Sequence, residues 1–234
     1  MKTGTAQITV GESRRAAERF TGVAVVVDVL RCSTTLCALL ACGKKDVRVY
    51  ADKAAAVEAR LARPETEFFS ELEYPPGFEK FDNSPWQALH ADPTKPAISI
   101  TGAGTQAMLG CTSAKRILAG CFANIPYIAP YLRGLEDEVM IVPACLFFHY
   151  HIEDVVCAHA IADAVAGKDT ADKAIARLMK NGRAEEFLEA RKATGEKDVA
   201  LALKVGTLKA IPEISLRGKY GQVTNALLPS ARKP

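Results

Sequence analysis

GVAVVVDVLRCSTT, residues 22–35, is an apolar run that ends abruptly in a charged and hydroxylated turn. The run Val23–Val27 is apolar at every position, as expected of a strand that is buried on both faces of a sheet. The residues after the turn, LCALLACG, favour a helix that ends at Gly43, with Ser33 or Thr34 as the expected N-cap. The stretch therefore predicts a strand, a loop and a helix, the repeating unit of a parallel α/β sheet.

Two charged side chains, Asp28 and Arg31, stand where this strand is predicted to end. Ligands of open α/β sheets bind at the carboxyl ends of strands, where the next helix offers N–H groups and a positive dipole to an anion. Arg31 can bind phosphate oxygens with its planar guanidinium, and Asp28 can ligate Mg²⁺ directly or through water. The pattern alone fits either a phosphate and metal site or polar residues that only close a turn.

Strands and helices are predicted to alternate along most of the chain, which indicates an α/β fold with a mainly parallel sheet and helices on both faces. Further strands are expected at residues 5–10, 46–50, 66–70, 96–101, 115–119 and 138–144. Residues 169–206 have apolar residues at helical spacing and are expected to form a mostly helical covering segment. Residues 218–234 are expected to be loose or extended. We expect a single unit over residues 1–234, with two subdomains as the alternative.

The composition is that of a globular protein with a sizeable core. The 234 residues are 49% hydrophobic and 24% charged, and a net charge of +3 gives no reason to expect nucleic acid as a partner. No stretch resembles a membrane span or a signal peptide, so we expect a cytoplasmic protein without a membrane partner. The seven cysteines form no CxxC pair, which argues against zinc or a disulfide framework. A homodimer is an expected assembly, because the mixed-charge faces of residues 169–206 suit a subunit contact.

Residues 63–85 form a long irregular stretch that is rich in proline, aromatic and acidic residues. A loop of this length in a compact domain is commonly functional or mobile, and we expect it to lie near the site. Glu71 follows a short predicted strand within it. Asn83, Ser84 and Pro85 together predict the start of a short helix.

A glycine-containing turn, GAGT at residues 102–105, follows the strand predicted at residues 96–101. Glycines in such a turn let the backbone approach a ligand closely, and Thr105 supplies a hydroxyl near a helix N-terminus. A turn of small residues without a binding role is the alternative interpretation.

Glu153 and Asp154 are adjacent carboxylates at the start of another predicted helix. In a first helical turn they complement the helix dipole without any chemistry, yet carboxylates at a strand-to-helix junction also suit a hard cation. His149, His151 and His159 lie nearby in the sequence. A general acid or base among them is a better expectation than a transition-metal site, because no third ligand has a clear spacing.

Several of these stretches, in the same order, resemble the 2-phosphosulfolactate phosphatase family, the Mg²⁺-dependent phosphatases of coenzyme M biosynthesis. DVLRCSTT at residues 28–35 resembles the family signature DVLRATTT. SE at residues 70–71 and DNSP at residues 82–85 correspond to the family's GE and GNSP. TGAGT at residues 101–105 resembles TTNGT, and GCFAN at residues 120–124 resembles GSFLN. Glu153 and Asp154 correspond to a Glu-Asp pair that opens a helix.

The resemblance implies Mg²⁺-dependent hydrolysis of the phosphomonoester of 2-phosphosulfolactate, or of a related small phosphorylated hydroxy acid, to release phosphate. The implied catalytic residues are Asp28, Arg31, Glu153 and Asp154. The implied substrate-binding and phosphate-binding residues are Ser33, Thr34, Asn83, Ser84, Thr101, Gly104, Thr105 and Asn124. The implied Mg²⁺ ligands are Asp28, Glu71, Glu153 and Asp154. The identity of the base is left open, as is a covalent phosphoenzyme on Asp28 or Cys32, although Cys32 also fits the family's alanine position as a small buried residue.

The chain also departs from the family pattern. Gly102 and Ala103 stand in place of threonine and asparagine, which removes an amide side chain from the turn. Cys145 and residues 147–151 replace a glycine-containing loop, and His159 stands where the family has glycine. These changes touch the expected pocket. They keep a second interpretation open: a non-catalytic or altered-specificity homologue that binds a small anionic ligand.

Overall fold

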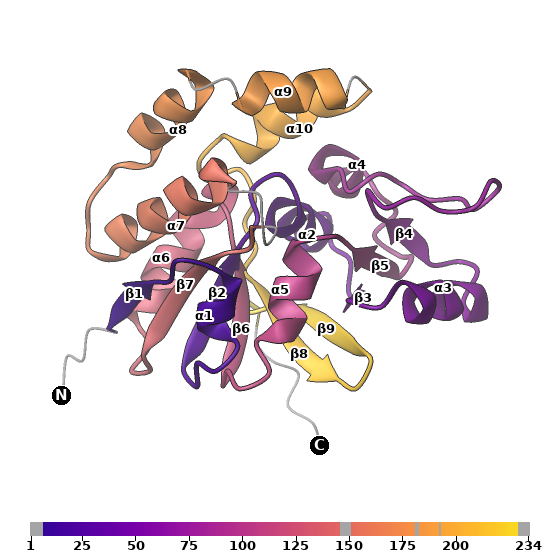
Figure 1. Cartoon of the computed structure of the whole chain (residues 1–234), viewed down its shortest axis with the longest axis horizontal. Coiled ribbons are helices and arrows are strands. Elements are labelled where there is room, and N and C mark those ends of the chain that lie inside the picture. The colour runs from indigo at the N-terminus through magenta and orange to yellow at the C-terminus, as the bar shows by residue number, and fades with distance from the viewer. Residues whose placement is uncertain (1–6, 146–150, 181–182, 192, 229–234) are drawn as a thin grey trace.

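The computed structural model describes residues 7–145, 151–180, 183–191 and 193–228 (Figure 1). The strands are β1 (Ile8–Val10), β2 (Val23–Val27), β3 (Val47–Tyr50), β4 (Glu67–Phe69), β5 (Ala97–Ile100), β6 (Arg116–Gly120), β7 (Val139–Pro143), β8 (Pro212–Arg217) and β9 (Tyr220–Asn225). The helices are α1 (Arg14–Ala17), α2 (Cys32–Ala41), α3 (Lys53–Ala62), α4 (Pro85–Leu89), α5 (Gly104–Gly110), the 3₁₀ turn η1 (Phe122–Asn124), α6 (Ile125–Arg133), α7 (Ile152–Val165), α8 (Ala171–Lys180), α9 (Arg183–Ala190) and α10 (Gly195–Ala202). The predicted α/β fold with a mainly parallel sheet and a helical C-terminal portion is confirmed.

The strand β2 occupies the predicted residues, and every one of its side chains is buried. It lies between β6 and β7 and is parallel to both, in a register that places Val27 beside Gly120 and Pro143. The three strands therefore end at the same level. The loops that follow them meet at one edge of the sheet, where open α/β sheets bind their ligands.

Successive residues of β2 face opposite sides of the sheet and contribute to two separate cores. Val23, Val25 and Val27 pack on one side with residues of α6, α7 and α8. Ala24 and Val26 pack on the other side with residues of α2 and α5. Helices therefore cover both faces of the sheet, as the sequence predicts.

The hairpin of β8 and β9 joins two groups of parallel strands into one sheet of nine strands, in the order β1-β7-β2-β6-β8-β9-β3-β5-β4. One group is β1, β7, β2 and β6, and the other is β3, β5 and β4. The hairpin pairs antiparallel with β6 on one side and with β3 on the other. Its tight turn contains Gly218 at φ 64°, a left-handed conformation that favours glycine.

One local prediction is wrong, the N-cap of α2. Residues 218–234 are predicted to be loose or extended at their end; β9 is extended and lies within the sheet, and residues 229–234 lie outside the described residues. Only Gly221 and Val223 of β9 are buried. The strand has no apolar pattern of its own, and its position is set by pairing with the neighbouring strands. The N-cap of α2 is Arg31 and not Ser33 or Thr34, which both lie in the first helical turn.

The helices α8, α9 and α10 fill the predicted helical segment at residues 169–206. In Figure 1 they form the upper part of the molecule, above α7 and next to α4. The helix α8 packs against α7, and α10 packs against α4 and α9. Within the described ranges no helix combines the length and the apolar character needed to cross a bilayer.

We predict that Gly221→Ala destabilises the fold, because β9 is packed on both of its sides. A Cβ at Gly221 would lie 2.5 Å from Ile214 Cγ2 and 2.8 Å from Val49 Cγ2. Overpacking of this kind lowers the free energy of unfolding by about 1–3 kcal/mol, which urea denaturation measures. The control is Gly110→Ala, because a Cβ at Gly110 meets nothing within 4 Å. Equal denaturation midpoints for the two variants would contradict the position of β9.

Candidate active site

A pocket of about 260 Å³ lies at the carboxyl ends of β2 and β5, and four of the residues predicted for the site line it: Asp28, Arg31, Glu71 and Asn83. Loops after β2, β4 and β5 form most of the pocket, and residues from α9 and the turn after it complete it. The lining side chains of chemical interest are Asp28, Arg31, Glu71, Asn83, His151, Glu186, Phe187 and Arg191. A larger groove of about 410 Å³ lies between α7 and α8, but Asp163 is the one carboxylate that lines it.

Asp28 lies at the centre of this arrangement and is 4% exposed. Its Oδ1 accepts a hydrogen bond from the Cys32 N–H at 3.1 Å, and its carbonyl oxygen accepts one from the Ser33 N–H. The sequence predicts that the N–H groups at the start of α2 bind an anionic ligand. Two of them, from Cys32 and Ser33, donate to Asp28 instead. The start of α5 packs so closely that a Cβ on Gly104 would lie 2.6 Å from Asp28 Oδ2.

Two further carboxylates act on the charge of Asp28, and each has one oxygen held and the other without a hydrogen bond. Asp154 Oδ1 accepts a hydrogen bond from the Val29 N–H at 2.8 Å, and Glu71 Oε1 accepts one from the Gly102 N–H at 2.8 Å. Asp154 Oδ2 and Glu71 Oε2 are buried and have no hydrogen-bond partner in the part of the chain that the structure describes. Buried carboxylate oxygens of this kind need a water, a proton or a cation.

The electrostatics of this acidic cluster favour a cation. Burial, followed by the negative charges of Asp154 and Glu71, raises the pKa of Asp28 to about 8. Burial also raises the pKa of Asp154. The carboxylate of Asp154, 3.7 Å from His151 Nδ1, raises the pKa of that imidazole. Carboxylates that share a buried site repel one another, and a bound cation or a shared proton relieves the repulsion.

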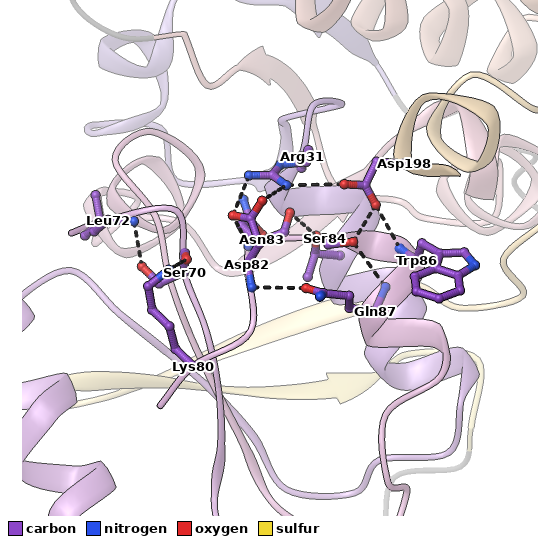
Figure 2. A network of polar contacts seen from close by, with 11 residues as sticks. Arg31, Ser70, Leu72, Lys80, Asp82, Asn83, Ser84, Trp86, Gln87 and Asp198 are labelled. Carbon is purple, nitrogen blue, oxygen red and sulfur yellow. Dashed lines mark hydrogen bonds and ion pairs between the residues drawn. The ribbon is translucent and has the colours of Figure 1, made fainter. Parts of the chain in front are cut away.

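Arg31 is held by two carboxylates, as Figure 2 shows. Its NH1 and NH2 groups donate hydrogen bonds to Asp82 at 2.6 and 2.8 Å, and NH1 also donates to Asp198 Oδ2 at 3.3 Å. The ring of Phe187 lies 5.4 Å from the guanidinium carbon. Although Asp82 is partly buried, its hydrogen bonds from Arg31 lower its pKa. Arg31 is 3% exposed and paired with carboxylates, and it still lines the pocket.

The sequence patterns single out neither Asp82 nor Asp198. Asp198 is fully buried in α10, and its Oδ1 accepts hydrogen bonds from Ser84 Oγ at 2.5 Å and the Trp86 N–H at 3.2 Å. It therefore connects α10 to the start of α4 and, through Arg31, to the start of α2. Asp82 stands at the glycine position of the family's GNSP, and this departure is a signal that could have found it. An acid in the first turn of a helix carries no such signal, because the helix dipole already explains it.

The hydroxyl groups of Ser33 and Thr34 hold the loop after β2. Ser33 Oγ donates a hydrogen bond to the Val26 carbonyl at 3.1 Å and accepts one from the Asp28 N–H at 3.0 Å. Thr34 Oγ1 donates to the Val29 carbonyl at 2.8 Å. Neither side chain lines the pocket, so phosphate binding by these hydroxyls stays a prediction.

Thr101, Gly104 and Thr105 shape the turn between β5 and α5. The Thr105 N–H donates to Thr101 Oγ1 at 3.0 Å, and the Thr101 N–H donates to Thr105 Oγ1 at 2.9 Å. Glycine is required at position 104, because a Cβ there would lie 2.4 Å from Cys32 Cβ. These three residues lie behind the pocket wall, and their binding role also stays a prediction.

Asn83 and Ser84 form the helix start predicted at residues 83–85, which is confirmed. Ser84 is the N-cap of α4, and its Oγ accepts a hydrogen bond from the Gln87 N–H at 3.1 Å. Asn83 lines the pocket, and its Oδ1 is buried without a hydrogen-bond partner among the described residues. Asn83 is thus the amide positioned to contact a ligand.

Asn124 and Glu153 do not line the pocket. Asn124 is fully buried: its Oδ1 accepts from the Cys121 N–H, and its Nδ2 donates to the carbonyls of Ala119 and Ala210. It ties the end of β6 to the segment before β8. Glu153 is buried in the first turn of α7. The predicted roles of both residues at the site stay predictions.

The three histidines that the sequence predicts near the site differ in their positions. His151 lines the pocket beside Asp154, and His149 lies outside the described residues. The expectation that His159 alters the pocket is wrong, because this side chain is exposed and lines the groove between α7 and α8. Five residues along α7 from Asp154, it points about 140° away around the helix.

Cys32 is fully buried, which fits the prediction of a small packed residue. Burial and then the charge of Asp28 raise the pKa of its thiol well above the usual range. The thiol therefore stays protonated, and it is a poor nucleophile.

The donor chemistry of the pocket fits Mg²⁺, although no group of three His, Cys, Asp or Glu side chains within the described ranges converges as a metal site. The two oxygens without hydrogen bonds, Glu71 Oε2 and Asp154 Oδ2, belong to carboxylates, the hard ligands that Mg²⁺ prefers. Mg²⁺ commonly binds through one or two carboxylates, with waters and substrate phosphate as its other ligands. The residues present are sufficient for that mode.

Comparison with known proteins identifies the family. The profile of the 2-phosphosulpholactate phosphatase family matches residues 10–216. A Symbiobacterium thermophilum protein named probable 2-phosphosulfolactate phosphatase is 35% identical over 159 residues, which cover 65% of this chain and 68% of the relative. Relatives of the same name from Thermoplasma volcanium and Thermoplasma acidophilum are 22% and 26% identical, covering 85% and 88% of this chain and 92% and 91% of the relatives. Because the family profile spans most of its length, the chain belongs to the 2-phosphosulfolactate phosphatase family.

Proposed function

We propose that this chain hydrolyses the phosphomonoester of 2-phosphosulfolactate, or of a related small phosphorylated hydroxy acid, in an Mg²⁺-dependent reaction. The observation that carries the proposal is the cluster of buried Asp28 and Asp154 with half-buried Glu71 at the pocket, where the pKa of Asp28 is raised to about 8. Phosphoryl transfer requires positive charge against the phosphoryl oxygens and a positioned water. The family profile and the names of the relatives support the substrate class.

One or two of the carboxylates Asp28, Glu71 and Asp154 would hold the Mg²⁺ in this proposal, with waters and the substrate phosphate as its other ligands. The ion would supply Lewis-acid stabilisation of charge on the transferring phosphoryl group. The chain's own contribution is to keep these carboxylates buried and fixed by the N–H groups of Cys32, Val29 and Gly102. His151 lines the pocket with an imidazole whose charged form Asp154 favours, so it is suited to donate a proton to the leaving alkoxide.

Arg31 and Asn83 would orient the substrate. A guanidinium has five N–H donors, and three hydrogen bonds from Arg31 go to Asp82 and Asp198. The remaining N–H groups are available to phosphate oxygens, and the two carboxylates fix the direction in which they point. The buried Oδ1 of Asn83 is an acceptor for a water or a substrate hydroxyl.

Phosphate release from 2-phosphosulfolactate, measured with and without Mg²⁺, tests the proposal. We expect metal-dependent turnover that falls about 10²- to 10³-fold in Asp28→Asn, because the charge that holds the cation is lost. Asp172→Asn is the matched control, since Asp172 is an exposed acid in the first turn of α8. Full activity after metal removal would contradict the Mg²⁺ requirement.

The outcomes also separate the alternative interpretations. A folded protein that binds Mg²⁺ and phosphate but hydrolyses no phosphomonoester would be a non-catalytic homologue. Turnover confined to another phosphorylated hydroxy acid would keep the chemistry and change the substrate, as relative kcat/KM values would show.

A second prediction concerns stability in EDTA. The pKa of Asp28 is about 8 in the folded protein and about 4 in an unfolded chain. Between these values the folded state binds a proton that the unfolded state has lost, so the free energy of unfolding falls as the pH rises. Thermal denaturation should show a steeper fall in Tm from about pH 5 to pH 8 for the wild type than for Asp28→Asn. Mg²⁺ should raise the wild-type Tm at the upper pH. Parallel Tm profiles would contradict the buried charge repulsion.

A further inference from the structure

We propose that Arg191 binds the anionic group of the substrate that is not transferred, the sulfonate or the carboxylate of 2-phosphosulfolactate. The assignment rests on the function proposed above and extends it to substrate specificity. Arg191 lies directly after α9 and belongs to none of the sequence stretches that resemble the family.

The two arginines that line the pocket differ in how their charges are balanced. Arg31 is paired with Asp82 and Asp198, both within 3.3 Å. Arg191 takes part in none of the ion pairs between described residues, and its side chain is half-buried. Its charge contributes to the lowered pKa of Asp82, which indicates that it faces the same part of the site. Arg191 is therefore a cation of the pocket that acts on Asp82 from a distance and has no close carboxylate partner among the described ion pairs.

The backbone of Arg191 is fixed relative to the rest of the site. Its carbonyl oxygen accepts hydrogen bonds from the Thr194 N–H at 3.2 Å and the Gly195 N–H at 2.6 Å, in the turn that leads to α10. The helix α10 is anchored by Asp198, which binds both Arg31 and Ser84. A cation that only complemented the dipole at the end of α9 could equally point into solvent, whereas Arg191 lines the pocket.

The distribution of charge gives the substrate one orientation. The phosphate of the substrate is the group that binds together with the cation, so it is best placed next to the acids Asp28 and Glu71. They repel a second anionic group, which is therefore best placed toward α9. On that side the pocket is lined by one acid, Glu186, and one cation, Arg191, so an anionic group there is best placed against Arg191. Its planar fork forms paired hydrogen bonds with a carboxylate or a sulfonate.

Calorimetric titration of the Mg²⁺-loaded full chain with sulfolactate and, separately, with inorganic phosphate tests this assignment. Arg191→Met should weaken sulfolactate binding about 10- to 100-fold, the loss of a charge-assisted hydrogen bond, and leave phosphate binding within about twofold. Arg177→Met is the matched control, because Arg177 is an exposed arginine on α8 that does not line this pocket. It should change neither affinity.

Two substrate analogues identify the group that Arg191 contacts. 2-Phospholactate lacks the sulfonate, and the phosphate ester of isethionate lacks the carboxylate. The loss of kcat/KM in Arg191→Met should disappear for the analogue that lacks the contacted group and persist for the other.

If Arg191→Met leaves the sulfolactate affinity unchanged, or weakens the binding of sulfolactate and of phosphate equally, the assignment of Arg191 is overturned and the proposed function is not. Failure of the wild-type chain to bind sulfolactate would overturn the proposed substrate and this assignment together. The two failures are distinguishable, because the second is visible before any variant is made. Circular dichroism of each variant confirms that a loss of binding is not a loss of fold.

Discussion

A buried guanidinium between two carboxylates holds the site together. Arg31 comes from the loop after β2, whereas Asp82 and Asp198 lie 51 and 167 residues further along the chain. A buried charge is tolerated only when it is paired and hydrogen-bonded, and the loss of one partner leaves another charge uncompensated. The three segments must therefore assemble together. The ion pairs couple the helices over the pocket to the strand ends that form its base.

In the acidic cluster beside this network, like charges lie together and repel one another. Asp28, Asp154 and Glu71 are brought together with the His151 imidazole, 3.7 Å from Asp154, as a partial balance, and the folded state bears the repulsion that remains, because the pKa of Asp28 is still raised. Stability is commonly lost at functional sites in this way, because groups arranged for a ligand are poorly matched to one another. The same repulsion gives the site its affinity for a cation. The balanced Arg31 and the unbalanced acids thus lie side by side with separate roles.

The parts of the fold that depend on neighbours in sequence were predictable, and those that depend on distant partners were not. The apolar run Val23–Val27 predicts a strand, and the capping chemistry of Ser84 predicts a helix start. The strand β9 has no such pattern, because β8 and β3 provide its hydrogen bonds and its burial. Asp198 has no local signal either, since its partners lie in α4 and the loop after β2. The orientation of His159 depended on the rotation of α7, which the sequence does not fix.

The hairpin of β8 and β9 has a consequence for how the chain reaches its folded state during synthesis. The strands β3 and β6 are made early, and each has one neighbour that arrives only with residues 212–225. Until then both strands present an unpaired edge, the kind of surface on which chains join one another and aggregate. The nascent chain therefore carries two open edges at once, and a single late element closes both.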